Sequence, residues 1–473
     1  MAWRKEGQLY YRTQSMVQQT ALSRRSGARK MDEDLTRISM YKIPNNIGNK
    51  IFPSPKRNNA IINYFAIGLI AFGLLFIEQK VLKFFIFPLN VSTSLIVIRW
   101  YSLLIYIFII IELIRRAKYH IKLGGSFIFL GFLYIIQFLS FIINVPITSF
   151  YAFITNYLFG YSIDVMLCIL CYLYCSELLI KLLPPLIFFI CTINLFFMLT
   201  PLDVLSGFRF LALGPLGSSY SLSTVGLYTY PTEVGILSAI TVALAFSLES
   251  IILIIIISII GLLSATLSLE RAPLLGMVFI LFPIIYFLKN RIRKPQNIFI
   301  LLIFSLVIFI AYRQLPGYFY KAQSTLFARF QLGSYGSTDQ NTLLGAWTPR
   351  NDMFSSWVNL TLESPFFGNG IEGVDEYMQE SGLIGIGHNM FLNSSTRNGI
   401  IFAFFLIIIC IRAIIGFWRV KRTRWGVAYF AAYLSVFPSL LIHALAPWLF
   451  WILLAIGMII YDQNKTMLMR INS

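Results

Sequence analysis

The sequence predicts an all-α polytopic membrane protein, with about 12 transmembrane helices and one large external loop between helices 9 and 10. Three observations lead to this fold class. Hydrophobic residues make up 58% of the 473 residues and charged residues only 12%, which is too little charge for a soluble chain of this length. Apolar runs recur from Ile61 onward. The longest interruption between them lies from Tyr312 to Asn398.

The N-terminal residues 1–60 are predicted to form a disordered basic tail in the cytoplasm. This tail holds twelve Lys and Arg residues against four acidic ones, and it contains no apolar run that would make a secretory signal. Such a charge favours contact with anionic lipid headgroups. Membrane lipids are therefore expected partners of the tail.

The transmembrane helices are predicted in two blocks, helices 1–9 in residues 61–311 and helices 10–12, with a short cytoplasmic tail, in residues 399–473. Residues 312–398 between them are predicted to form a folded external (periplasmic) cap. A spanning helix needs about 20 mostly apolar residues, and several runs are shorter. The runs are Ile61–Ile77, Val91–Leu113, Ser126–Ile143, Tyr157–Leu179, Leu183–Leu199, Pro231–Leu248, Ile251–Thr266, Pro273–Leu288, Ile298–Ala311, Ile400–Ile415, Trp425–Ile442 and Trp448–Ile460.

The basic residues between the runs predict the orientation. With the N-terminal tail in the cytoplasm, the dense basic clusters at 115–122, 289–294 and 419–424 all fall on the cytoplasmic side, as the positive-inside trend requires. The net charge of +18 is thereby explained by basic residues that lie on the cytoplasmic side of the membrane. We therefore predict no nucleic-acid partner.

The cysteines do not predict a metal site. Cys168, Cys171 and Cys175 are closely spaced, but their neighbours are apolar and no fourth ligand lies nearby in the sequence. We interpret them as small hydrophobic residues of a helix. Neither a cofactor nor a metal is predicted, with an isolated Asp352 or Glu372 left as the alternative ligand for a divalent ion.

Three arginines lie in predicted external loops, against the positive-inside trend. Arg209, Arg271 and Arg350 each offer a planar fork of donors that matches a phosphate group. If they converge, they would suit a lipid-linked pyrophosphate at the membrane surface. The alternative is that each arginine anchors the chain at the interface or pairs with a nearby acid such as Glu270.

A histidine and an asparagine stand just before the chain re-enters the membrane. His388 follows Gly385-Ile-Gly387 and precedes Asn389 at a predicted helix entrance. An imidazole titrates near neutral pH, so His388 can accept a proton from a sugar hydroxyl. The alternative is that His388 serves as a polar cap on the next helix.

Two charged residues are predicted within the bilayer. Arg99 and Asp164 lie at similar depths in their own runs, and an ion in a membrane is costly unless it is paired. We expect a structural Arg99–Asp164 ion pair, with a transport pathway as the alternative.

Four short motifs, in this order between Leu205 and Ile415, resemble the O-antigen ligase/polymerase superfamily of bacterial envelope enzymes. Each motif is loose, but their common order on one side of the membrane makes the resemblance fairly specific. In this sequence they read Gly207-Phe-Arg-Phe-Leu-Ala-Leu-Gly214, then Ser268-Leu-Glu-Arg-Ala-Pro-Leu-Leu-Gly276, then Arg350…Trp357…Pro365-Phe-Phe-Gly368-Asn-Gly370, and last His388-Asn389 followed after nine residues by Gly399.

The resemblance implies a reaction in which a glycan on undecaprenyl pyrophosphate is transferred to a sugar hydroxyl. The expected partners are that lipid-linked glycan and an acceptor glycan or lipid A-core, with a chain-length regulator as a candidate partner. The expected location is the bacterial inner (cytoplasmic) membrane, with the active site facing the periplasm or the exterior. The ligase form of the last motif has Gly, Thr or Tyr three residues after the glycine. Phe402 occupies that position here, which favours a polymerase.

By matching motif positions, the resemblance also implies roles for single residues. Arg209 and Arg271 would bind the pyrophosphate, and His388 would be the catalytic base. Arg350 and Asn389 would hold the acceptor or the loop. A transporter of lipid-linked glycans is the alternative from another class, although the sequence has no evident internal repeat.

Overall fold

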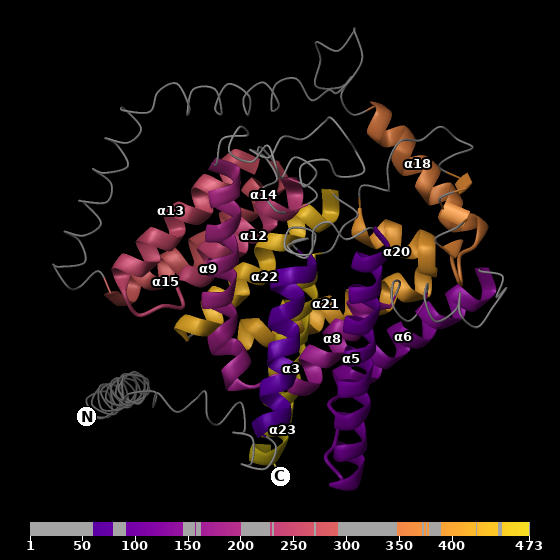
Figure 1. The fold of residues 1–473 in the computed structure, drawn as a ribbon, viewed down its shortest axis with the longest axis horizontal. Helices are drawn as coiled ribbons and strands as arrows, with labels where there is room; N and C mark the ends of the chain where they lie inside the picture. The colour runs from indigo at the N-terminus through magenta and orange to yellow at the C-terminus, as the bar shows by residue number, and fades with distance from the viewer. Residues whose placement is uncertain are drawn as a thin grey trace, which may run out of the picture. The chain divides into compact units, whose positions relative to one another are not determined.

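The computed structural model (Figure 1) describes residues 60–78, 91–144, 157, 162–199, 228, 231–268, 271–291, 348–370, 373–374, 376–377, 389–421, 423–442 and 447–472. All of them belong to one compact unit, Pro55–Ser473. Every regular element within these ranges is a helix, which confirms the helical class. The elements are α3 (Ala60–Phe72), η2 (Gly73–Glu78), α5 (Val91–Lys118), α6 (Gly125–Asn144), α8 (Ile163–Tyr174), α9 (Glu177–Leu199), α12 (Pro231–Ala245), α13 (Ile251–Ser268), α14 (Arg271–Gly276), η5 (Met277–Ile280), α15 (Leu281–Arg291), α18 (Thr348–Glu363), α20 (Met390–Asn398), α21 (Ile400–Val420), α22 (Arg424–Ile442) and α23 (Trp448–Asn472).

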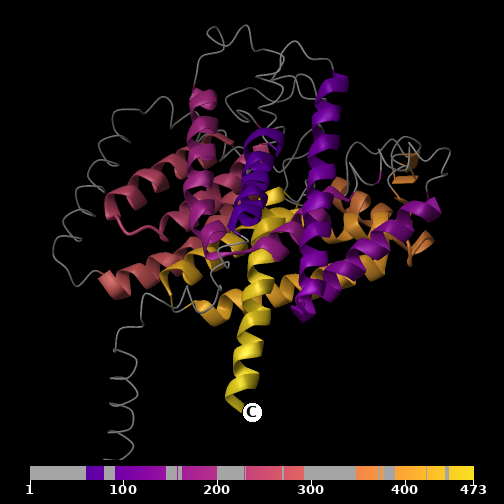
Figure 2. The ribbon, with the colours of Figure 1, turned by 60° about the horizontal axis from the view of Figure 1, so that its bottom comes forward.

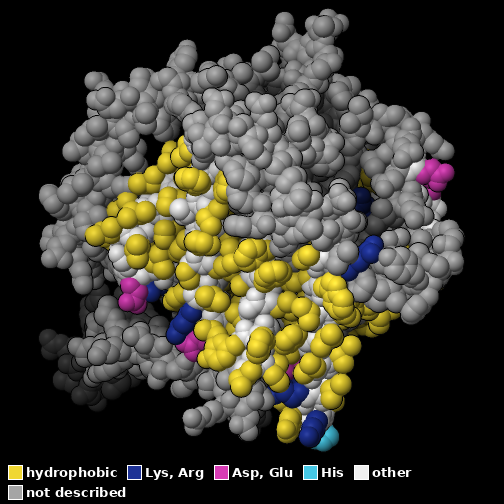
Figure 3. Space-filling model, viewed as in Figure 1, with side chains coloured by type: hydrophobic (Ala, Val, Ile, Leu, Met, Phe, Trp, Pro, Cys, Tyr) yellow, Lys and Arg dark blue, Asp and Glu magenta, His cyan; other side chains and the backbone are white. Residues whose placement is uncertain are grey.

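Five helices within the described ranges are long and apolar enough to cross a membrane. They are Val97–Lys118 of α5, together with α6, α9, α13 and α21. Figure 3 shows hydrophobic side chains over much of the described surface in that view, with basic side chains scattered among them. Large apolar side chains exposed to this extent indicate a membrane protein. Other apolar helices, such as α8, are shorter than a span, so the count of twelve stays a prediction.

The short helix α8 and the apolar part of α23 form the centre of the bundle. All residues of α8 from Val165 to Tyr174 are buried, and so are Leu449–Ile460 of α23. A helix that is apolar on every side is stable only inside a larger assembly of helices. α23 packs against both α8 and α21, and in Figure 2 it runs from the middle of the bundle out to the labelled C-terminus. Gly416 of α21 meets Gly457 of α23 backbone to backbone, because neither residue has a side chain to separate the helices.

A second group of helices surrounds α12. α12 packs against α13, α22, α14 and α9. The space between α12 and α13 has no room for a Cβ at Gly261, which touches Val242 and the Ser238 carbonyl. Gly235 of α12 similarly meets the ring of Pro273 in α14. α14, which begins at Arg271, packs against both α12 and α22.

The predicted Arg99–Asp164 ion pair is not formed in the described part of the chain. Asp164 lies in the first turn of α8, and its carboxylate is hydrogen-bonded by the indole of Trp448. The prediction is wrong because α8 begins only at Ile163, whereas the apolar run starts at Tyr157. Asp164 therefore stands at a helix N-terminus, where the helix dipole already favours a carboxylate.

On the predicted cytoplasmic side, two carboxylates each accept hydrogen bonds from several donors. Glu112 has a side chain only 2% exposed, and it accepts hydrogen bonds from Arg115 and Arg116. Asp462 accepts hydrogen bonds from the backbone N–H of Ser126 at 3.0 Å, from its hydroxyl at 3.1 Å, and from the Tyr172 hydroxyl at 2.6 Å. Asp462 thereby joins α6, α8 and α23 at one point.

Replacing Asp462 with asparagine is expected to destabilise the protein. Asparagine lacks the negative charge of the carboxylate, and its NH₂ group cannot accept a hydrogen bond from the donors that face it. A hydrogen bond to a charged group contributes about 1.5–3 kcal/mol to the stability of the folded protein. We expect a lower unfolding temperature of the purified protein in detergent. Glu249→Gln is the matched control, because the Glu249 side chain is 89% exposed and meets Arg424 at 3.3 Å. Equal unfolding temperatures for the two variants would contradict this role of Asp462.

Candidate functional site

The structure describes only part of the predicted site. Arg209 and His388 lie outside the described residues. Arg271 begins α14 and Arg350 lies in the first turn of α18, and for both only the backbone is described. Asn389 is described in full. The convergence of the three arginines on His388 therefore stays a prediction.

Asn389 is the N-cap of α20. Its side-chain oxygen accepts hydrogen bonds from the backbone N–H groups of Phe391 at 2.9 Å and Leu392 at 3.1 Å. These donors belong to the first turn of the helix and have no partner within it. Asn389 thus holds the entrance to α20, and capping of this helix does not require His388.

Two of the sequence motifs bind each other directly. The carbonyl of Pro365 accepts a hydrogen bond of 2.7 Å from the backbone N–H of Ile400. The backbone N–H of Asn369 donates to the Thr396 carbonyl at 2.8 Å. The Asn369 side chain also donates to the Leu360 carbonyl at 2.7 Å. The turn that contains Gly368 and Gly370 is therefore held between α18 and α20, and we call α18, residues 364–370 and α20 the α18–α20 unit.

Two glycines, one within this unit and one directly after it, have backbones that a side chain would disrupt. Gly399 has φ +90°, and a Cβ there would overlap the Phe366 carbonyl. Gly368 has φ +67°, and a Cβ there would overlap the backbone of Arg397. Positive φ values are accessible to glycine at little cost. The glycines of the last two motifs therefore permit the close approach of the two segments.

α18 and α20 share a small buried interface. The hydroxyls of Thr361 and Thr396 are hydrogen-bonded at 2.7 Å, and the Thr361 hydroxyl also donates to the Trp357 carbonyl at 2.8 Å. Trp357 is 1% exposed and packs with Leu360 and Val374. This part of the predicted external loop thus has a hydrophobic core of its own.

The α18–α20 unit rests on the C-terminal end of α6. The side-chain amide of Asn144 donates to the Gly368 carbonyl at 3.0 Å. The hydroxyl of Ser140 donates to the Arg397 carbonyl at 3.0 Å. Both bonds fix backbone atoms, so the position of α20 relative to α6 is well defined.

The motif that contains Arg271 continues into α14, which packs against α22. Gly276 at the end of α14 touches the backbone of Ser435 in α22, and α20 packs against α22 as well. Figure 1 shows α22 between α14 and α20. One helix therefore contacts the elements that carry Arg271 and Asn389.

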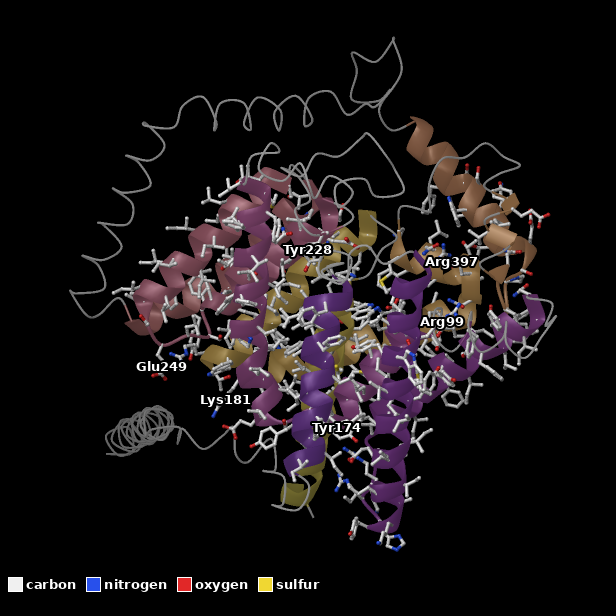
Figure 4. All side chains as sticks on the ribbon, in the orientation of Figure 1. Arg99, Tyr174, Lys181, Tyr228, Glu249 and Arg397 are labelled. Atoms are coloured by element: carbon white, nitrogen blue, oxygen red, sulfur yellow. The ribbon has the colours of Figure 1, made fainter. Side chains whose placement is uncertain are left out.

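Sequence reasoning missed two polar residues of α20. Arg397, labelled in Figure 4, is half-buried, and its buried Nε has no hydrogen-bond partner within the described structure. Asn393 is 8% exposed, and its Oδ1 also lacks a partner there. The sequence signal was their separation by four residues within the last motif, which puts both on one face of a helix.

The described residues contain no group of three or more His, Cys, Asp or Glu side chains arranged to hold a metal ion. The prediction that the reaction needs no metal remains a prediction. No family model matches the sequence, and no curated protein matches it significantly. The superfamily resemblance therefore depends on the four motifs themselves.

Proposed function

We propose that this protein is a membrane glycosyltransferase that moves an undecaprenyl-pyrophosphate-linked glycan onto a sugar hydroxyl, and that it acts as a polymerase of O-antigen or a related surface polysaccharide. The observation that carries this proposal is the order of the four motifs. The direct backbone hydrogen bonds between the Gly368 turn and the segment at Gly399 support it, because they hold the last two motifs against each other in the folded protein.

In the proposed reaction, His388 removes the proton from the acceptor hydroxyl. The hydroxyl oxygen forms a bond to the anomeric carbon of the donor sugar, and the bond from that carbon to the pyrophosphate oxygen breaks. The undecaprenyl pyrophosphate leaves with the bonding electron pair. Arg209 and Arg271 stabilise the negative charge that it gains. Arg350 binds the acceptor, and Asn389 fixes the helix that follows His388.

The ligase alternative would transfer the glycan to lipid A-core. Position 402 argues against it, because Phe402 is 3% exposed within α21 and replaces the small or hydroxylated residue of the ligase motif. A transporter of lipid-linked glycans is the alternative of another class. Such a protein would use charged residues along a path through the bilayer. Here the buried carboxylate of Glu112 is held by arginines, and the partly buried carboxylate of Asp462 is held by serine and tyrosine donors.

The glycan pattern of a strain that lacks this protein tests the proposal. A lost polymerase is expected to leave single repeat units on lipid A-core, and the wild-type gene should restore long chains. Long polymer retained on the carrier lipid would show that the lost protein is a ligase. Lipid-linked repeat units trapped on the cytoplasmic side would show a transporter, and an unchanged pattern would reject all three functions.

A further inference from the structure

The face of α20 that carries Asn393 and Arg397 has unused hydrogen-bonding groups. The Nε of Arg397 is a buried donor, and the Oδ1 of Asn393 is a buried acceptor, both without a partner among the described residues. An unsatisfied buried polar atom costs about 1–3 kcal/mol, and more when the group is charged. The two atoms lie one helical turn apart on α20, and buried polar atoms of a folded protein require a partner, which a bound molecule can supply.

The backbone around these side chains is rigid. The Arg397 carbonyl accepts from Ser140, and the backbone N–H of Asn393 donates to the Asn389 carbonyl at 2.8 Å. The neighbouring Thr396 is bonded to Thr361 of α18. The two side chains therefore project from a fixed helix, which lowers the entropic cost of binding a ligand.

The Arg397 guanidinium and the Asn393 amide oxygen bind different chemical groups of a ligand. A guanidinium binds an oxyanion such as a phosphate or a carboxylate. An amide oxygen accepts a hydrogen bond from a hydroxyl. A sugar with an oxyanion close to a hydroxyl offers both, and this arrangement occurs in glycosyl phosphates and in uronic acids.

We propose that Arg397 and Asn393 form a subsite for a sugar that carries an oxyanion next to a hydroxyl. This inference rests on the proposed function in one respect, because it assigns the subsite to the glycan substrate. The phosphate would belong to the donor linkage, whereas a carboxylate would belong to an acidic sugar of the repeat unit. Arg397 binds the oxyanion and Asn393 orients the sugar through its hydroxyl.

Probe binding to the full-length protein in detergent tests the subsite. The probes are glucose 1-phosphate, glucuronate and neutral glucose, and the measurement is isothermal titration calorimetry. We expect wild-type protein to bind at least one charged probe more than tenfold tighter than glucose. Preference for glucose 1-phosphate assigns the subsite to the donor linkage, and preference for glucuronate assigns it to an acidic sugar. Equal binding of all three probes would overturn the proposal.

Variants separate recognition from folding. Arg397→Gln is expected to weaken binding of the preferred charged probe at least tenfold, and Asn393→Leu to weaken it severalfold. Arg424→Gln, a change in an arginine that pairs with the exposed Glu249, should bind as wild type. Because the buried Nε of Arg397 has no hydrogen-bond partner in the described structure, Arg397→Gln should unfold at or above the wild-type temperature. Unchanged binding, or a marked loss of stability in Arg397→Gln, would refute the subsite.

The binding measurement does not depend on turnover, so it can fail independently of the proposed function. Wild-type protein that polymerises glycan but binds no charged probe would reject the subsite and keep the transferase. Arg397-dependent binding in a protein whose deletion leaves the glycan pattern unchanged would keep the subsite and reject the transferase.

Discussion

Replacing His388 with alanine is expected to abolish glycan transfer while the protein still folds. Removal of a general base lowers a rate about 10²- to 10⁴-fold. The helix that follows should form normally, because its N-cap is Asn389. The measurement is transfer of a lipid-linked repeat unit to an acceptor glycan by purified protein, with the unfolding temperature recorded in parallel.

The matched control for this variant is His120→Ala. His120 is exposed in the short connection between α5 and α6, in a predicted cytoplasmic loop. Wild-type turnover is expected for the control. Wild-type turnover in His388→Ala would refute the assignment of the base, and equal losses in the two variants would show that the effect is not specific to residue 388.

Replacing Gly399 with alanine is expected to cause the largest loss of folded protein among the substitutions considered. The added Cβ would overlap the Phe366 carbonyl, and the φ of +90° is unfavourable for alanine. A strained backbone of this kind costs about 1–3 kcal/mol before the overlap is relieved. The bond from the Ile400 N–H to the Pro365 carbonyl should also be lost. The unfolding temperature and the glycan transfer rate should both fall.

Gly131→Ala is the control for this substitution. Gly131 lies within α6, and nothing is close enough to meet an added Cβ. Alanine favours a helix over glycine by about 1 kcal/mol, so this variant should be as stable as the wild type or more so. Similar unfolding temperatures for the two alanine variants would contradict the packing described at Gly399.

Much of the helical architecture follows from hydropathy. The run Ser126–Ile143 predicts α6, observed as Gly125–Asn144. The run Tyr157–Leu179 fails because the structure breaks it at Cys175 and Ser176, so that α8 ends and α9 begins within one apolar stretch. Hydropathy measures transfer into an apolar phase, and it does not register where the backbone turns between two buried helices.

The candidate site was only partly predictable for a similar reason. Asn389 was recognisable because asparagine before a helix is a common capping residue. Arg397 was not, because its interest lies in the missing partner of its Nε, and a missing partner is visible only when the surrounding atoms are known. The Arg99–Asp164 pairing failed because hydropathy placed Asp164 well inside an apolar run, whereas α8 begins only one residue before it.

The attachment of the α18–α20 unit to α6 has a mechanical consequence. Asn144 and Ser140 of α6 donate hydrogen bonds to the adjacent Gly368 and Arg397 carbonyls, so a change in the inclination of α6 is expected to move α20 with it. A membrane-crossing helix adjusts its inclination to the thickness of the surrounding lipid. The acyl-chain length of the host bilayer is therefore expected to shift the position of the proposed Asn393–Arg397 subsite.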